Sequence, residues 1–191
     1  GVGGRINAQL NQLNIPTTPP ATSAEFRGSY AAIGYKGGSC SFCKGSYTRR
    51  YGSKARVTST ICPGMLTSSS ATCSDFQVIG EGCNQGRECA HSCGCAITRR
   101  NGVKTMWYDH GDRSRYHRGF GLAVYRGTDH VEIKDEYHHF TSLHTLENAL
   151  QAVPSKHIIV LASMDEPFGG GWNSGVGGRI NSILRNSFKI P

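Results

Sequence analysis

Cysteine is the residue type in this chain that could do the most chemistry, because thiolates bind metals and thiol pairs form disulfides. All eight cysteines fall between residues 40 and 95, in a stretch rich in glycine, serine and threonine. The motifs CSFC at 40–43 and CAHSCGC at 89–95, with His91, have spacings that fit zinc ligands. An even number of cysteines in a segment with few apolar residues is more typical of disulfides made in an oxidising compartment. We therefore expect disulfides and an extracellular, secreted protein, with the pairing left open. The predicted disulfide cysteines are Cys40, Cys43, Cys62, Cys73, Cys83, Cys89, Cys93 and Cys95.

Acid–base side chains are the second possible source of chemistry. His138, His139 and His144 lack the HExxH spacing of a zinc-dependent hydrolase. Asp165 and Glu166 follow an apolar run, but no set of nucleophile, base and orienting residue accompanies them. The sequence therefore predicts no enzymatic activity, no metal site and no cofactor.

The chain is basic, with 21 Lys and Arg against 13 Asp and Glu and a net charge of +8. Nucleic-acid-binding proteins concentrate such charge in a patch or stripe. Here the charge is scattered, and the pairs at 49–50 and 99–100 are expected in loops, so no nucleic-acid partner is predicted. Attraction to anionic polysaccharide is the simpler expectation. No apolar run is long enough to cross a bilayer, so membrane insertion is not expected.

The two ends of the chain carry copies of the same sequence repeat. Residues 1–10 read GVGGRINAQL and residues 175–184 read GVGGRINSIL, with eight of ten positions identical. Both copies continue to an Ile-Pro pair, at 15–16 and at 190–191, one of them with a single extra residue. Repeats of this kind indicate an array of similar units. We favour a chain that spans the junction of two tandem units over a deliberate terminal duplication, and expect a multi-unit polymer.

Local patterns predict a sheet-rich fold with few helices. Three prolines make residues 16–23 an extended linker that ends a short first helix. Leucines at helical spacing predict a helix over 141–153, with Thr141 or Ser142 as N-cap and Pro154 as the stop. The continuous apolar run at 156–164 predicts a strand buried on both faces. Further strands are expected at 26–35, 55–61, 119–126 and 129–137, and a hairpin around Asn101-Gly102.

Four segments together resemble the ILEI/PANDER lectin-like domain family: 26–37 (FRGSYAAIGYKG), 118–125 (RGFGLAVY), 140–150 (FTSLHTLENAL) and 158–166 (IIVLASMDE). The resemblance implies an α+β fold, a β-sandwich with flanking helices. Members of that family occur as secreted cytokine-like proteins and as accessory modules of carbohydrate-active proteins, some of which bind sugars. The resemblance therefore also implies a secreted protein or a module of this kind. The chain departs from the family in order, because the FRGSY-like strand precedes the other segments here.

This order suggests a domain cut in its middle. Residues 1–38 resemble the back half of one domain, 39–95 a cysteine-rich insert, and 96–191 the front and middle of the next domain. Residues 1–38 either complete the sheet of their own chain or lend a strand to a neighbouring unit, and we favour the second arrangement. The predicted polymer-interface residues are Phe26, Tyr30, Ile33 and Tyr35.

Side chains suited to carbohydrate contact are sparse. Trp107, Arg118 and Trp172 are the sugar-binding candidates, because aromatic faces stack on sugar rings and guanidinium groups bind hydroxyls. No Asn-x-Ser/Thr sequon occurs. The O-glycan candidates in Pro/Ser/Thr-rich segments are Thr17, Thr18, Thr22, Ser68 and Ser69.

The sequence as a whole predicts the repeat unit of a secreted extracellular filament or matrix protein that polymerises head to tail. Its expected partners are other copies of itself and extracellular glycans. The alternative is a lectin-like module or a secreted signalling ligand of the same fold.

Overall fold

The computed structural model describes residues 28–48, 52–66, 72–82, 94–109, 119–138, 143–164 and 175–191. For 107–109, 130–138, 143, 175 and 176 it describes the backbone alone. The strands are β1 (Tyr30–Lys36), β2 (Lys44–Tyr47), β3 (Lys54–Ile61), β4 (Ser74–Glu81), β5 (Cys95–Arg100), β6 (Val103–Asp109), β7 (Gly119–Arg126), β8 (Asp129–His138) and β9 (His157–Met164). The helices are the short η1 (Pro63–Met65), α2 (Leu143–Ala152) and α3 (Gly175–Asn186).

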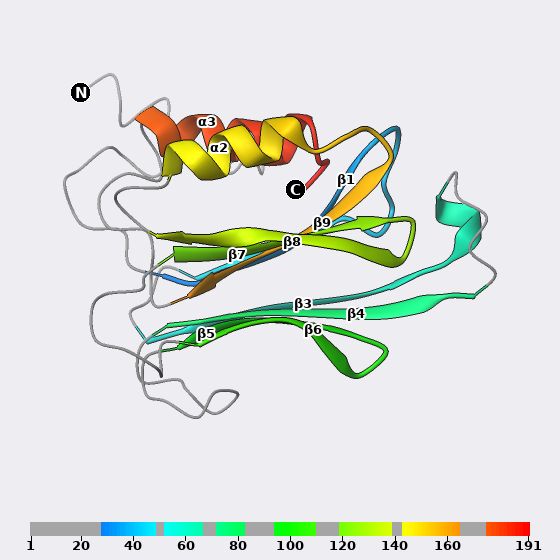
Figure 1. The fold of residues 1–191 in the computed structure, drawn as a ribbon, viewed down its shortest axis with the longest axis horizontal. Helices are drawn as coiled ribbons and strands as arrows, with labels where there is room; N and C mark the ends of the chain where they lie inside the picture. The colour runs from blue at the N-terminus through cyan, green and yellow to red at the C-terminus, as the bar shows by residue number, and fades with distance from the viewer. Residues whose placement is uncertain are drawn as a thin grey trace, which may run out of the picture.

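The elements form a helix layer on a two-layer β-sandwich (Figure 1). In the middle layer β9 pairs antiparallel with β1 and with β7, and these pair in turn with β2 and β8. In the outer layer β4 lies between β3 and β5, and β5 pairs with β6. A parallel bridge between Glu81 and Met164 joins the two layers. Helices α2 and α3 cover the free face of the middle sheet. The α+β class expected from the sequence is confirmed.

Strand β9 explains why the core has two parts. Ile158 and Val160 face the other sheet, where they join Phe76 in the inter-sheet cluster. Ile159 and Leu161 face the helices and join a second cluster. Because successive side chains of a strand point to opposite faces, only a strand covered on both sides can be apolar throughout. The prediction of a central, doubly buried strand at 156–164 is confirmed.

The Asn101-Gly102 hairpin is also confirmed. It joins β5 to β6, and both residues have positive φ, 50° at Asn101 and 79° at Gly102. Asparagine and glycine are the residues that tolerate this conformation best. The turn is fixed to β4, since the Asp75 backbone N–H donates to Asn101 Oδ1 at 2.8 Å and the Asn101 N–H donates to Asp75 O at 2.8 Å. Arg99 and Arg100, expected in a loop, instead end β5.

The cysteine-rich segment differs from the expected insert because it supplies strands to both sheets. It contains β2 of the middle sheet and β3 and β4 of the outer sheet. β4 was not expected, although Phe76 and Val78 alternate with exposed or half-exposed residues as in a strand with one buried face. Without β3 and β4 the outer sheet would consist of β5 and β6 alone.

Disulfides brace this segment. Cys40 pairs with Cys43, with Cα atoms 5.5 Å apart, and Cys62 pairs with Cys73 across the connection from β3 to β4, with Cα atoms 4.0 Å apart. Cys95 is also disulfide-bonded. The remaining cysteines, Cys83, Cys89 and Cys93, lie outside the described residues.

Strand β1 completes the middle sheet of its own chain. It pairs with β9 from Ala31↔Ala162 to Lys36↔His157. Tyr30, Ile33 and Tyr35 are 7%, 0% and 4% exposed within this chain. This is the arrangement that the sequence analysis did not favour, and a neighbour could reach these side chains only by replacing β1. The fourth interface candidate, Phe26, lies outside the described residues.

Candidate functional site

Helix α3 and the residues that follow it pack against an apolar surface, which we call the helix slot. Its floor is the free face of β1, β7 and β9, and α2 forms one wall. Ile180, Leu184, Phe188 and Ile190 enter it and are 0%, 1%, 0% and 3% exposed. They meet apolar side chains from the sheet and from α2, namely Leu122, Val124, Leu146, Leu150, Val153, Ile159 and Leu161.

A charged pair sets the register of α3 against α2. Arg179 Nε and Nη2 donate to the two carboxylate oxygens of Glu147, at 2.6 and 3.0 Å. The Glu147 side chain is 9% exposed and that of Arg179 is 53% exposed. His144 Nδ1 lies 3.7 Å from Glu147 Oε2 on the same helix. The hydrogen bonds from Arg179 lower the pKa of Glu147 below its usual value and raise that of Arg179. A two-point contact of this kind fixes orientation as well as adding attraction.

The tail after α3 depends on two glycines of the sheet. The Tyr35 N–H donates to Phe188 O at 2.9 Å. A Cβ at Gly34 would lie 2.8 Å from Phe188 Cβ, and a Cβ at Gly45 would lie 2.8 Å from Ile190 Cγ2. Only residues without a side chain allow the tail to approach the sheet this closely.

Lys36 links the slot to the end of α2. Its Nζ donates to the carbonyl oxygens of Gln151 and Val153, at 2.8 and 2.6 Å. A cation at the carboxyl end of a helix also interacts favourably with the helix dipole. The same Nζ lies 5.9 Å from the centre of the Phe188 ring. One lysine thus contacts both segments that bound this end of the slot.

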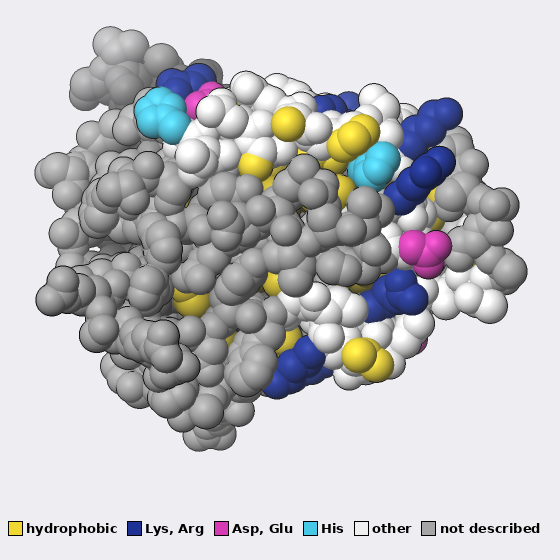
Figure 2. Space-filling model, in the orientation of Figure 1, with side chains coloured by type: hydrophobic (Ala, Val, Ile, Leu, Met, Phe, Trp, Pro, Cys, Tyr) yellow, Lys and Arg dark blue, Asp and Glu magenta, His cyan; other side chains and the backbone are white. Residues whose placement is uncertain are grey.

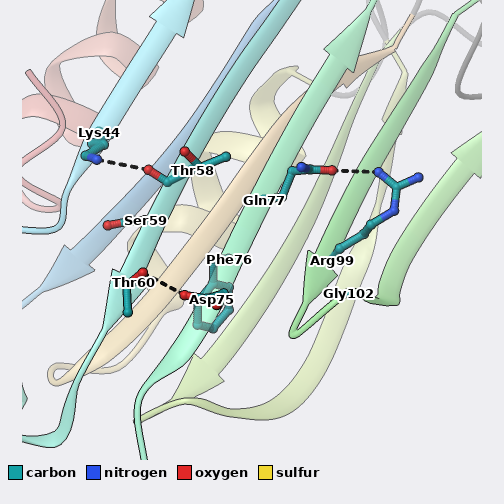
Figure 3. Close-up of a pocket in the computed structure, with 9 residues that line it drawn as sticks. All are labelled: Lys44, Thr58, Ser59, Thr60, Asp75, Phe76, Gln77, Arg99 and Gly102. Carbon is teal, nitrogen blue, oxygen red and sulfur yellow. Dashed lines mark hydrogen bonds between the residues drawn. The ribbon is translucent and has the colours of Figure 1, made fainter.

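A second candidate surface is a polar groove on the open face of the outer sheet (Figure 3). It has a volume of about 360 Å³. Lys44 Nζ donates to Thr58 O at 2.9 Å, and Arg99 Nη1 donates to Gln77 Oε1 at 2.7 Å. The groove is lined by Lys44, Thr58, Ser59, Thr60, Asp75, Phe76, Gln77, Arg99 and Gly102.

The groove has the donors and acceptors of a binding surface. Thr60 Oγ1 donates to Asp75 Oδ1 at 2.6 Å. Lys44 and Arg99 add positive charge along the lining, while Asp75 is its acidic side chain. Hydroxyl, amide and guanidinium groups on an open sheet face can hydrogen-bond sugar hydroxyls and pair with sulfate or carboxylate.

A further hollow of about 350 Å³ lies at the end of the sandwich, next to the turn from β7 to β8. Tyr35, Arg126, Lys156 and His157 contribute to it, and His157 Nδ1 lies 2.9 Å from Ser155 O. Figure 2 shows Lys and Arg side chains gathering at this end of the molecule, on the right of the view. On this face the Lys and Arg side chains of the described residues are therefore denser at this end.

A buried acid, Glu81, is the last residue of β4. Glu81 is fully buried, and its Oε1 lies 3.1 Å from Lys54 Nζ, whose side chain is 31% exposed. Glu81 Oε2 lies 3.5 Å from Cys95 Sγ. A buried carboxylate needs such a partner, because an unpaired charge is costly to desolvate. We assign this pair a structural role at the point where the two sheets join.

Of the sugar-binding and O-glycan candidates, one falls in the described part of the chain. Trp107 lies on β6 opposite Ile97, with only its backbone described, while Arg118 and Trp172 are outside. The O-glycan candidates and the Asp165–Glu166 pair also lie outside the described residues. His144 is exposed on α2. Within the described residues no group of three or more His, Cys, Asp or Glu side chains could hold a metal ion.

The sequence analysis did not identify Glu147 and Arg179. A signal was available, since the arginine of this pair recurs in the terminal repeat as Arg5. The groove had no comparable signal, because its lining comes from four strands separated along the chain.

Comparison with known proteins gives no match to a family model, to a curated protein or to a solved structure. The resemblance to the ILEI/PANDER family therefore stays a prediction. Among the described helices, none is long and apolar enough to cross a membrane.

Proposed function

We propose that this chain is a structural repeat unit of a secreted extracellular protein that assembles head to tail. The observation that carries the proposal is the correspondence between the terminal repeat and the burial of α3. Arg179, Ile180 and Leu184 make the contacts of the slot, and the first copy has the same residue types at these three positions.

Most differences between the copies fall at exposed positions of α3, although the buried Phe188 has no phenylalanine counterpart in residues 1–16. Ser182, Arg185 and Asn186 are exposed on α3, and the first copy has other residues at these positions. Half-buried Ile183 is replaced by Gln9. Identity that follows burial is expected when two segments are made for the same kind of slot, because packing constrains buried side chains and leaves exposed ones free. This supports a series of units, each with its own helix slot.

Secretion is supported by the disulfides. The pairs Cys40–Cys43 and Cys62–Cys73 brace the connections from β1 to β2 and from β3 to β4. Structural disulfides persist mainly in oxidising compartments. A sandwich with a helix layer is also what the ILEI/PANDER resemblance implies, but one fold serves many functions, so the repeat carries more weight here.

The test is electron microscopy of the native material. Repeat units should give fibres or chains with a regular axial period, and three-dimensional reconstruction should show one sandwich per period. Discrete particles with one sandwich each would contradict the proposal and would leave the glycan-binding alternative in first place.

Glycan binding is the second candidate, and the groove in Figure 3 favours it. We expect a sulfated polysaccharide to bind there, because Lys44 and Arg99 can pair with sulfate groups. Arg99→Gln should weaken binding about tenfold, the scale of a lost charge-assisted contact. The measurement is titration calorimetry at low salt, because added salt screens such contacts.

Two controls define the outcome of this titration. Lys189→Gln removes an exposed positive charge from the tail after α3 and should leave the affinity unchanged. A neutral polysaccharide of the same length should bind weakly to the unaltered protein. If Arg99→Gln and Lys189→Gln lowered the affinity equally, binding would depend on general electrostatic attraction and not on the groove.

A further inference from the structure

The helix slot holds one segment, and the chain carries two segments that share most of the side chains that fill it, Phe188 excepted. Residues 175–191 fill the slot through Arg179, Ile180, Leu184 and Ile190. Residues 1–16 contain the same types in the same order. The corresponding residues of the first copy are Arg5, Ile6, Leu10 and Ile15.

We infer that residues 1–16 of one copy bind the helix slot of a second copy and replace residues 175–191 there. The inference rests on the proposed function, since it names the contact between units. The partner is a second copy of this chain, and the contact is the one that α3 makes.

The physical reason is that two segments with apolar side chains at helical spacing compete for one apolar binding surface. Ile6 and Leu10 are four residues apart, as Ile180 and Leu184 are, and this spacing places both side chains of a helix on one face. Such a face must be buried against something. The slot of the same chain already holds 175–191. The slot of another copy offers these side chains the contacts that Ile180 and Leu184 make.

The two segments do not compete equally. Residues 175–191 are tethered to their slot, which gives them an effective concentration of about 1 mM. A segment from another copy must exceed this advantage, so exchange is favoured where units are concentrated or where α3 is weakened. A solution of the unaltered chain should therefore self-associate weakly.

Glu147 makes the exchange testable without disturbing the core. Its carboxylate contacts residue 179, whose side chain is more than half exposed. Arg179→Glu places a second carboxylate beside it and weakens the chain's own α3. Arg5 of another copy would then be the better partner for Glu147.

The experiment is sedimentation velocity of full-length chains over a range of concentrations. Arg179→Glu should tighten self-association about tenfold, the scale of a coupling between contacting residues. The double variant Arg5→Glu/Arg179→Glu should lose that gain, because both segments then carry the wrong charge. Arg5→Glu alone should be monomeric.

Two controls keep the result specific. Arg185→Glu makes the same charge change at an exposed position of α3 and should sediment as the unaltered chain does. Glu147→Arg/Arg179→Glu restores the pair within the chain and should be monomeric. Circular dichroism of each variant should match that of the unaltered chain, which checks that the fold is kept.

The inference is overturned if Arg179→Glu sediments as the unaltered chain does, or if the double variant associates as strongly as Arg179→Glu. A monomer whose thermal stability depends on Arg5 would place residues 1–16 in the slot of their own chain and would equally reject exchange. Neither outcome touches the repeat-unit proposal, which fails only if the native material has no axial period.

Discussion

At the scale of single residues, the pairing of Glu147 with Arg179 makes stability depend on pH. The pKa of Glu147 is lowered in the folded state, so its contribution is present above the unfolded value and is lost as pH falls through the folded pKa. At pH values below 4.5, the reference pKa of an unfolded glutamate, the free energy of unfolding should therefore decrease. The decrease should be larger for the unaltered chain than for Glu147→Gln. Urea unfolding at a series of pH values measures this difference. Parallel pH profiles of the two proteins would contradict it.

The glycines under the tail give a second residue-scale prediction. A Cβ at Gly34 would lie 2.8 Å from Phe188 Cβ and 2.9 Å from Ile190 Cδ1. Gly34→Ala should lower the free energy of unfolding by about 1–3 kcal/mol, the usual cost of overpacking a filled core. Gly38→Ala is the matched control, because a Cβ there meets no atom within 4 Å. Equal stability of the two variants in urea titrations would show that the tail does not need this close approach.

At the scale of elements, the connection from β3 to β4 depends on a disulfide. Cys62 and Cys73 are 11 positions apart. A disulfide that closes a loop of this length lowers the entropy of the unfolded chain, which stabilises the folded state by about 3 kcal/mol. Replacing both with serine should lower the free energy of unfolding by that amount. Cys40 and Cys43 are 3 positions apart, so the same change there should cost only about 1.5 kcal/mol. Urea titration of the two double variants compares them, and the reverse order of stability would contradict the loop-length explanation.

At the scale of the whole molecule, β9 couples the helix layer to the outer sheet. Leu161 faces the helices and Val160 faces the other sheet. We expect one cooperative unfolding transition, in which Leu161→Ala destabilises both layers by about 2–5 kcal/mol. Native-state hydrogen exchange should show lower protection in α2 and in β4 alike. Loss of protection confined to α2 would instead mark the helix layer as a separate unit.

The same scale decides how copies associate. A slot that accepts one segment, in a chain with two matching segments, gives a contact in which each unit offers a helix at one point and receives one at another. Contacts of this heterologous kind do not close on themselves and can generate filaments. Strand β1, which the sequence analysis favoured for exchange, is held by β9 and by β2 in its own chain. The helix segment is therefore the better candidate for the link.

The sequence by itself determined those elements whose local pattern has a single physical solution. The apolar run of β9 requires cover on both faces, the Asn101-Gly102 pair requires a tight turn, and the leucine spacing of α2 requires a helix that ends before Pro154. Each of these depends on neighbours along the chain, so the sequence alone was sufficient.

Only the tertiary structure decided which segments meet. It brought β1 to β9 of its own chain, assembled the groove from separate strands and set Arg179 against Glu147, thirty-two positions away. It also made β2, β3 and β4 integral to the sandwich. Such contacts depend on burial and charge summed over the whole fold, which no local pattern contains.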